Sequence, residues 1–513
     1  ANGIPRLQKP PLNYWLTAIC YEIFGVNKWS GRAPTALAAW LLLAIVYRLT
    51  NWLFDPRDRR AGLFAAALLL GSLLFYRFMR LAETDALAAL FVTAAIAAWW
   101  RASDIAHPVA AGSLDDDVAR ASRPCPGAEN TGETPVLRNI LWWHLGAAAT
   151  ALAAMSKGPP AAFPLLFLLA ICATARTARP LRSLLRSGAL LTFLAIAGPW
   201  FAYIYFSVGF ARIIDEVDVV TNGRDHPNWF WIYIPYILYA VLPWTAFVIA
   251  GIADAAGRLR DPRRLGLLLW SLAILLPLCA IGNKQNHYLL PLLPPLMMLA
   301  GVWIAETLRP GASPQRLRLA RLLLIVTCAT IALIAPGLIV AGWQKSRVWR
   351  ATDACAAAVV LALAAIAFFA LFRRGLRAGF ITTAAAAALA MVVMNAFWAP
   401  TVRHGDWNEV AASVRRRGAD GWIAYGPANL RLCYALQQTI PMLKTPDELQ
   451  AALTRHPALL VLVMKKHAGA TDAMRILGLR EAVSYDIDDE EIGLFQHAPG
   501  ELHPPPDKQG THD

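Results

Sequence analysis

RLLLIVTCATIALIAPGLIVAGW, residues 321–343, decides the fold class of this chain. Its only charged residue is Arg321 at the first position, and the rest is apolar or weakly polar. A helix of about 20 such residues is what the hydrocarbon core of a bilayer requires. Runs of this kind recur from about residue 34 to residue 399. The sequence therefore predicts an all-α polytopic membrane protein.

The composition supports this prediction, because 57% of the residues are hydrophobic and only 16% are charged. Soluble domains are nearer a quarter charged. About twelve spans fit the chain, allowing about 20 residues each. They are predicted at 34–52, 62–78, 84–100, 139–155, 159–175, 188–206, 230–253, 265–281, 288–306, 321–343, 354–372 and 379–399. The seven cysteines are scattered without a CxxC pair, so neither a disulfide framework nor a zinc site is indicated.

The net charge of +14 sets topology rather than binding nucleic acid, because the basic residues form short clusters between apolar runs. Alternate connections are strongly basic, and the positive-inside rule places them in the cytoplasm. Apart from the long loop 101–138, they hold Arg57, Arg59, Arg60, Arg176, Arg179, Arg182, Arg186, Arg258, Arg260, Arg263, Arg264, Arg309, Arg316, Arg318, Arg373, Arg374 and Arg377. The other connections face outward: 1–33, 79–83, 156–158, 207–229, 282–287, 344–353 and everything after 400.

Three domains or segments follow from the changes in composition. Residues 1–399 form the transmembrane domain, in which the Gly-, Pro-, Ser- and Asp-rich loop 101–138 is expected to be disordered. Residues 400–499 alternate short elements, which predicts a small extracytoplasmic α/β domain. Its role is either acceptor recognition or closure of a lid, or it is a packing domain without a role in the reaction. Its elements are an amphipathic helix at 406–417, then GWIAYG at 421–426, helices at 428–437 and 446–456, and strands at 458–464 and 491–496. Residues 500–513 are expected to be a disordered tail.

The outward loops carry the unusual polar residues of the chain. Singly, each residue is explained as a snorkelling or interfacial anchor, but anchoring does not require carboxylates and cations together in five loops on one face. Carboxylates with isolated cations suit acid–base chemistry beside a phosphate leaving group. The candidates are Lys9, Glu83, Asp85, Lys157, Glu216, Arg224, His226, Lys284, His287 and Tyr288.

Two other function classes compete with such an enzyme. A transporter or flippase of a lipid-linked sugar would place ionisable residues near the bilayer midplane and often shows inverted repeats. This chain shows no repeat, and its polar residues lie in loops. A membrane scaffold for the outer domain would not require lysines and carboxylates in separate outer loops.

An ordered series of motifs resembles a known superfamily. KPPLNYW at 9–15, FGV at 24–26 and GRAP at 31–34 are followed by RLAETDAL at 80–87 and SKGPP at 156–160. GPWF at 198–201, DHPNWFWIYIPYILYAVLPW at 225–244 and NKQNHYLLPLLPPL at 283–296 complete the series. Together they resemble the membrane-embedded GT-C glycosyltransferases of the protein O-mannosyltransferase and lipid A aminoarabinose transferase superfamily. The resemblance covers roughly residues 1–306.

The resemblance implies transfer of a monosaccharide from a polyprenyl-phosphate donor to a lipid, glycan or protein acceptor, on the outer face of the cell inner membrane. Lys9 matches the KPPL lysine that contacts the donor phosphate in relatives. Lys284, His287 and Tyr288 match a loop over that phosphate, and Asp85 matches an acidic residue at the mouth of a span. In these terms the catalytic candidates are Asp85, Glu83 and Glu216. The substrate-binding candidates are Lys9, Lys157, Arg224, Lys284, His287 and Tyr288.

The chain departs from the family pattern in two ways. Relatives often have Glu before the motif lysine, where it helps to hold a metal, whereas this chain has Gln8. Because an amide is a poor ligand for a hard dication, we expect at most weak dependence on a divalent metal ion, with His226 as a candidate ligand. The family's catalytic Asp precedes the KPPL motif, and we expect it, with a first span, upstream of Ala1.

Overall fold

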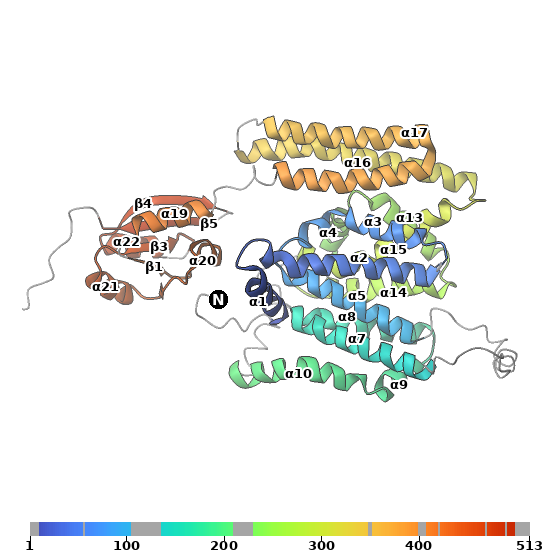
Figure 1. The fold of residues 1–513 in the computed structure, drawn as a ribbon, viewed down its shortest axis with the longest axis horizontal. Helices are drawn as coiled ribbons and strands as arrows, with labels where there is room; N and C mark the ends of the chain where they lie inside the picture. The colour runs from blue at the N-terminus through green and yellow to red at the C-terminus, as the bar shows by residue number, and fades with distance from the viewer. Residues whose placement is uncertain are drawn as a thin grey trace, which may run out of the picture. The chain divides into compact units, whose positions relative to one another are not determined.

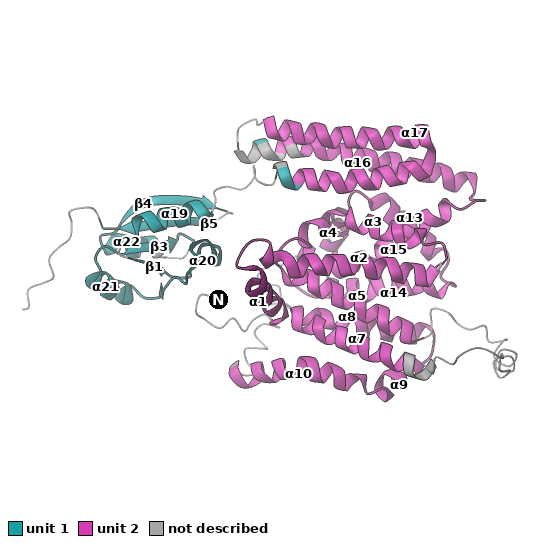
Figure 2. Cartoon of the chain, in the orientation of Figure 1, with its two compact units in different colours: residues 1–6, 341–350, 395–513 teal, residues 7–340, 351–394 magenta. Residues whose placement is uncertain are grey.

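The computed structural model describes residues 10–54, 57–103, 135–208, 229–346, 351–398, 407–418, 421–466, 469–487 and 490–497. The chain forms two compact units (Figure 2). The larger unit comprises residues 7–340 and 351–394, and the smaller comprises residues 395–513 together with 1–6 and 341–350. The helical body and the small C-terminal sheet expected from the sequence are both confirmed (Figure 1).

The larger unit is built from helices, with a helix at every position where a span is predicted. They are α1 (Leu12–Phe24), η1 (Ser30–Arg32), α2 (Ala33–Phe54), α3 (Arg60–Leu70), α4 (Leu73–Phe78), α5 (Thr84–Ala102), α7 (Pro135–Lys157), η2 (Pro159–Ala161), α8 (Ala162–Thr174), α9 (Arg179–Arg186), α10 (Ala189–Val208), η3 (Phe230–Ile232), α12 (Tyr233–Ala240), α13 (Thr245–Ala256), α14 (Pro262–Ala280), η4 (Asn286–Leu292), α15 (Leu293–Thr307), α16 (Pro314–Ser346) and α17 (Ala351–Val393). Helix α7 begins at Pro135, inside the predicted loop 101–138, and residues 104–134 lie outside the described residues.

Within the described ranges, seven helices are long and apolar enough to cross a membrane, or eight if one bent pair is a single span. The number of about twelve spans therefore stays a prediction. One of the seven, residues 351–396, contains a break at Gly375, whose φ of 82° is outside the helical region. Glycine adopts this conformation at little cost. The break falls between the two spans predicted at 354–372 and 379–399.

Two predicted spans are not continuous helices. The stretch 62–78 is divided into α3 and α4 by Gly71 and Ser72, and α12 meets α13 at a bend of 112°. The two breaks contact each other, because the Leu73 amide donates to the Leu242 carbonyl at 2.9 Å. A Cβ on Gly71 would lie 3.2 Å from the indole nitrogen of buried Trp244. Each of these two stretches was predicted as a single span, and the structure interrupts both; where the breaks meet, the Leu73 amide finds its acceptor at the other break.

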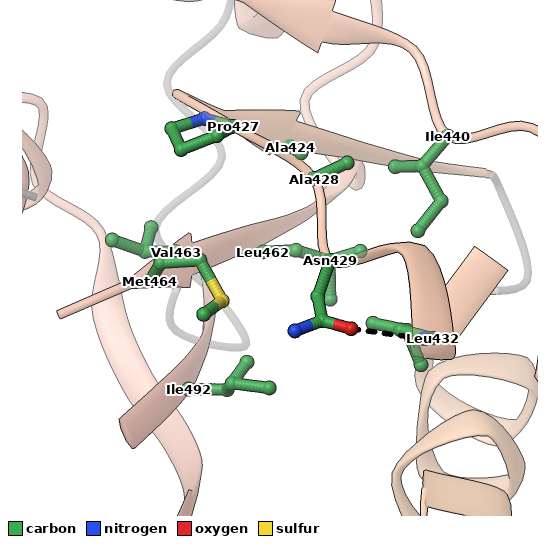
Figure 3. A pocket seen from close by; sticks show the side chains of 10 residues that line it. All are labelled: Ala424, Pro427, Ala428, Asn429, Leu432, Ile440, Leu462, Val463, Met464 and Ile492. Atoms are coloured by element: carbon green, nitrogen blue, oxygen red, sulfur yellow. Dashed lines mark hydrogen bonds between the residues drawn. The ribbon is translucent and has the colours of Figure 1, made fainter. Parts of the chain in front are cut away.

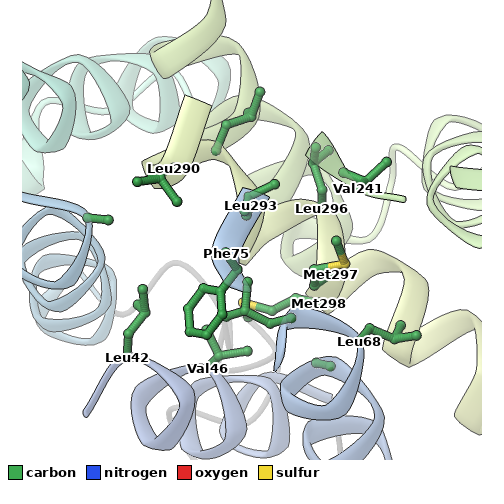
Figure 4. Packing of buried hydrophobic residues seen from close by; sticks show 14 of the residues in the cluster. Leu42, Val46, Leu68, Phe75, Val241, Leu290, Leu293, Leu296, Met297 and Met298 are labelled. Atoms are coloured by element: carbon green, nitrogen blue, oxygen red, sulfur yellow. The ribbon is translucent and has the colours of Figure 1, made fainter. Parts of the chain in front are cut away.

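Helix α15 forms the centre of the larger unit. Nearly all of its residues are buried, and Figure 4 shows Leu293, Leu296, Met297 and Met298 packed among side chains of α2, α3 and α4. Gly301 allows α15 to approach α3 closely, since a Cβ there would lie 2.6 Å from the backbone nitrogen of Ala65. The residues just before α15 are held in place by this packing.

The smaller unit is an α/β layer structure. Its elements are α19 (Trp407–Arg417), β1 (Trp422–Tyr425), α20 (Leu430–Leu436), β2 (Met442–Leu443), α21 (Pro446–Arg455), β3 (Leu460–Met464), α22 (Ala470–Ile476), β4 (Arg480–Ile487) and β5 (Glu490–Gln496). The strand order is β2-β1-β3-β5-β4, with β1 parallel to β2 and β3, and β5 antiparallel to β3 and β4. Strand β4 was not predicted, because it is a mostly exposed edge strand without a strong apolar run.

Candidate functional site

The N-terminus of α5 and the C-terminus of α7 bring a carboxylate and an ammonium together. Asp85 lies in the first turn of α5, where a negative charge is favoured, and Lys157 is the last residue of α7, where a positive charge is favoured. The ammonium of Lys157 donates a hydrogen bond to Oδ1 of Asp85. Asp85 is 7% exposed, so this is a largely buried ion pair.

The stretch before α15 brings two aromatic rings to the same pair. Tyr288 presents its ring to Lys157, with 4.2 Å between the ammonium nitrogen and the ring centroid. His287 places Nε2 3.9 Å from Oδ2 of Asp85. Its ring also lies 5.2 Å from the ring of Phe78, centroid to centroid. We call Asp85, Lys157, His287 and Tyr288 the acid–base cluster.

Glu83 adjoins the acid–base cluster as the residue that precedes α5. Burial raises the pKa of the Glu83 carboxyl above its usual value, and the neighbouring Asp85 raises it further. The charges of Lys157 and Arg77 oppose both effects. A carboxylate with a raised pKa is a better proton acceptor than an ordinary one, which is the property that a general base requires.

The cluster is costly to build for structural purposes alone. Desolvating both charges of a buried ion pair costs about as much as their attraction returns, so such a pair is weak evidence of stabilisation. Ionisable groups in a membrane bundle are, by default, candidates for a functional site. Chemically, the arrangement offers an ammonium next to proton-accepting groups.

The role of Lys284 in binding the donor stays a prediction, and the structure shows what its side chain contacts. It is 4% exposed and donates to the carbonyl of Ile281, just beyond the end of α14. A lysine is commonly found capping the last carbonyls of a helix in this way. In this structure Lys284 therefore fixes the start of the loop that carries His287 and Tyr288.

Several predicted site residues lie outside the described residues. They are Lys9, with its neighbour Gln8, and Glu216, Arg224 and His226 of the loop between α10 and η3. Their predicted roles stay predictions. Among the residues that the structure describes, no three His, Cys, Asp or Glu side chains are grouped so that they could hold a metal ion.

The sequence interpretation missed Arg77 and Tyr239, which lie near the cluster. Nη1 of Arg77 donates to the Tyr239 hydroxyl at 3.4 Å, joining the end of α4 to α12. Arg77 falls inside the predicted span 62–78, so it was not among the charged residues assigned to the outer loops. The adjacent Gly71 and Ser72 were the available signal, because such pairs break helices.

The smaller unit has a shallow pocket of about 230 Å³, open to solvent, beside the ends of β1 and β3 (Figure 3). Pro427, Asn429 and Met464 are among its lining residues. The Asn429 side chain caps α20 by accepting from the Arg431 amide at 2.8 Å, and it donates to Glu490. Because the remaining lining side chains are apolar, the pocket offers no group for acid–base chemistry.

The fold of the chain is that of a solved membrane protein of known name. Its structure matches the crystal structure of ArnT from Cupriavidus metallidurans bound to undecaprenyl phosphate, with a TM-score of 0.69 at 18% sequence identity. The match covers 97% of this chain and 90% of that chain. At this level of identity the likeness defines the fold, that of a membrane-embedded protein.

Sequence comparison points in the same direction. Residues 8–109 match the family model described as dolichyl-phosphate-mannose-protein mannosyltransferase. The chain is 26% identical over 326 residues to the undecaprenyl phosphate-alpha-4-amino-4-deoxy-L-arabinose arabinosyl transferase of Pectobacterium carotovorum, covering 61% of this chain and 52% of that protein. The Pseudomonas aeruginosa enzyme of the same name is 27% identical over 322 residues, with coverages of 61% and 52%. The chain spans about half the length of these curated relatives, and the resemblance expected from the sequence is confirmed.

Proposed function

We propose that this chain is a glycosyltransferase that moves a monosaccharide from a polyprenyl-phosphate donor to an acceptor on the outer face of the inner membrane. The observation that carries the proposal is the acid–base cluster, formed by three separate elements in a fold shared with a protein captured with undecaprenyl phosphate. Of the expected acceptors we favour a lipid, because the curated relatives are the aminoarabinosyl transferases towards which the sequence motifs also point.

The described residues divide the chemistry between them. The acceptor hydroxyl attacks the anomeric carbon and gives its proton to a carboxylate, for which Glu83 is the described candidate. The bond from the anomeric carbon to the phosphate oxygen breaks, and its electron pair leaves with the polyprenyl phosphate. Lys157 stabilises that leaving phosphate as a point charge, while Asp85 and the ring of Tyr288 hold its ammonium in position.

The location of the reaction rests on the distribution of arginines. The cluster lies at connections that carry at most one Lys or Arg each, and the positive-inside rule directs those connections outward. The same rule directs the smaller unit outward. Transport of a lipid-linked sugar is the competing function, and the experiment below distinguishes it by whether the sugar is transferred to an acceptor.

The test is the transfer reaction of the complete protein in lipid nanodiscs, supplied with polyprenyl-phosphate sugars and lipid acceptors. Release of polyprenyl phosphate reports turnover whichever sugar is moved. Lys157→Met should lower the rate about a hundredfold, because one electrostatic contact to a developing charge is worth roughly 3 kcal/mol. Lys28→Met, at an exposed lysine of the first outer loop, is the matched control and should retain activity.

Two results would contradict the proposal. One is equal activity of the Lys157→Met and wild-type proteins at equal insertion. The other is movement of a lipid-linked sugar across vesicles, with no sugar transfer to any acceptor, which would establish the transporter.

A further inference from the structure

The two lysines at or next to the acid–base cluster donate to groups of the protein itself. Lys157 donates to Asp85, and Lys284 donates to the carbonyl of Ile281. A phosphate monoester carries close to two negative charges, and proteins usually meet it with several donors. A further cation near the cluster would give the phosphate additional donors.

Arg77 fits this description. It is exposed at the end of α4, and its Nη1 donates a long hydrogen bond of 3.4 Å to the Tyr239 hydroxyl. Its guanidinium carbon lies 5.3 Å from the ring centroid of Phe78. A guanidinium has five N–H donors, so a long bond to one hydroxyl leaves most of the fork available.

The position of Arg77 connects it to the cluster. Phe78, the next residue, packs against the ring of His287, and the charge of Arg77 acts on the Glu83 carboxyl. Lys157 acts on the same carboxyl. Glu83 is therefore within electrostatic reach of both cations, which places the guanidinium on the side of the bundle where the acid–base cluster lies.

The paired helix breaks fix Arg77 at this point. Because α3 stops at Leu70, α4 is a separate short helix, and its first amide is bonded to the carbonyl of Leu242 at the α12–α13 bend. Phe75 of α4 and Val241 of the bend both belong to the hydrophobic cluster drawn in Figure 4. The Arg77–Tyr239 bond spans the same two elements further along. Interrupted helices inside a membrane bundle are found where the chain is buried in protein or lines a cavity.

We propose that Arg77 is a further residue that binds the phosphate of the lipid-linked donor, and that Tyr239 positions it. The inference rests on the proposed function and adds to it a fork-shaped donor next to the point charge of Lys157. Arginine is suited to two parallel hydrogen bonds with a phosphate, whereas lysine provides a single charge. The phosphate of a bulk membrane lipid has the same chemistry, so the experiment must separate the two sources.

The test measures retention of radiolabelled polyprenyl phosphate by the complete protein in nanodiscs of zwitterionic lipid, with neutral polyprenol as a parallel probe. Arg77→Gln should weaken polyprenyl phosphate binding about tenfold and leave polyprenol binding unchanged. The affinity of Arg77→Lys for polyprenyl phosphate should lie between those of wild type and Arg77→Gln, because lysine keeps the charge but lacks the two parallel donors of arginine. Tyr239→Phe should weaken phosphate binding by about threefold, because Tyr239 acts only by positioning Arg77. In protein that already carries Arg77→Gln, the Tyr239→Phe substitution should therefore have no further effect. The matched control is Arg32→Gln, an exposed arginine of the first outer loop.

The outcomes separate the inference from the function beneath it. If wild-type protein retains polyprenyl phosphate and Arg77→Gln retains it equally well, the inference is wrong and the proposed function stands. Equal loss of polyprenyl phosphate and polyprenol would show that Arg77 only supports the fold. A defect that appears only when anionic phospholipid is added would assign Arg77 to bulk headgroups. Failure of the wild-type protein to bind polyprenyl phosphate would overturn the proposed function itself.

Discussion

At the scale of single residues, the Lys157–Asp85 pair shows how the ends of two helices prepare a site. Each charge is stabilised by the helix end on which it lies, so the pair is formed before any ligand arrives. The ring of Tyr288 limits where the ammonium can move. A phosphate that approaches this lysine meets a donor already in position, and little of its binding energy is spent on ordering the side chain.

The raised pKa of Glu83 leads to a pH-dependent prediction. Because burial, and then Asp85, favour the protonated carboxyl in the folded protein, Glu83 stabilises the fold below its ordinary pKa of 4.5. This contribution is lost as the pH rises through the higher folded-state value. The isosteric Glu83→Gln variant has no charge to desolvate, so it should unfold at a higher temperature than wild type at pH 8. The difference should shrink towards pH 5.

Thermal unfolding of both proteins in the same detergent, followed across this pH range, measures the effect. A stability difference that does not change with pH would mean that Glu83 titrates normally. In the transfer assay the same substitution should lower the rate, because an amide cannot accept the proton of the acceptor hydroxyl.

Lys9, which lies outside the described residues, is predicted to bind the donor phosphate. Two prolines stiffen the backbone after it, and an aromatic-rich stretch follows that favours the lipid surface. Lys9→Ala should therefore lower transfer about a hundredfold while the protein inserts normally. Lys9→Arg should keep only part of the activity.

An anchoring role for Lys9 would give a different pattern. Arginine would then substitute fully, and alanine would reduce protein yield more than specific activity. Turnover per inserted molecule, measured for both variants, distinguishes the two roles.

The sequence identified which outer loops carry charge, but it did not give their pairings. Asp85 and Lys157 are 72 positions apart, and only the antiparallel packing of α5 and α7 brings them into contact. Lys284 was grouped with His287 because of a shared motif, yet its ammonium turns back to a helix end. Periodicity and charge patterns locate elements and loops, whereas the direction of one long side chain depends on neighbours distant in sequence.

At the scale of elements, the larger unit depends on close approach between helices. Without a hydrophobic force between helices in lipid, packing of small residues provides much of the attraction. Gly301 is such a contact, because a side chain there would meet the backbone of α3 rather than a movable side chain. Gly337 of α16, by contrast, has open space around its Cβ position.

Gly301→Ala should therefore destabilise the protein although alanine is the better helix former. Forcing α15 away from α3 should cost about 1–3 kcal/mol, which outweighs the propensity gain of roughly 1 kcal/mol. Gly337→Ala is the matched control and should be neutral or mildly stabilising. Thermal unfolding in one detergent compares the three proteins, and a stable Gly301→Ala variant would show that α3 and α15 separate easily.

Hydrophobic patterns predicted where helices lie more reliably than whether they are continuous. Apart from Ser72 and Arg77, the stretch 62–78 forms one apolar run, and in the sequence only the Gly71–Ser72 pair, against which Trp244 packs, indicates the break. In the smaller unit the apolar run of β3 was predicted, whereas the exposed edge strand β4 carries little signal. Elements buried on both sides leave a clear pattern in the sequence, and edges and interruptions do not.

At the scale of the whole larger unit, a second set of charges joins α13, α14, α15 and α16. Arg264 is 6% exposed and pairs with Asp254, Asp261 and Glu306. Arg316 of α16 reaches Asp254 and Glu306, both at 3.3 Å. The carboxylates of this network form ion pairs with its arginines. Arg258 and Arg309 add further ion pairs at the same end, in agreement with the basic connections expected in the cytoplasm.

This arrangement gives the topology prediction a structural basis. Asp58, in the connection between α2 and α3, lies 3.8 Å from Arg309 in the connection between α15 and α16, counting from carboxylate oxygen to guanidinium nitrogen. Arg258 reaches Glu306 of α15, so the connection between α13 and α14 lies at the same end. Because three basic connections meet there, a single orientation must hold for all of them. Cysteines at 58 and 260 should therefore resist an impermeant thiol reagent in intact cells, whereas one at 345 should react.

The experiment requires a background in which the seven native cysteines are replaced, so that each new thiol is the only target. Asp58→Cys also removes ion pairs with Arg60 and Arg309, although such exposed pairs contribute at most about 1 kcal/mol to stability. Position 260 is therefore the decisive inner site. Labelling after permeabilisation must recover the signal at 58 and 260, which shows that protection came from the membrane and not from burial. If 260 reacts in intact cells and 345 does not, the acid–base cluster faces the cytoplasm. The donor would then be used on the inner leaflet, and the proposed direction of transfer would be reversed.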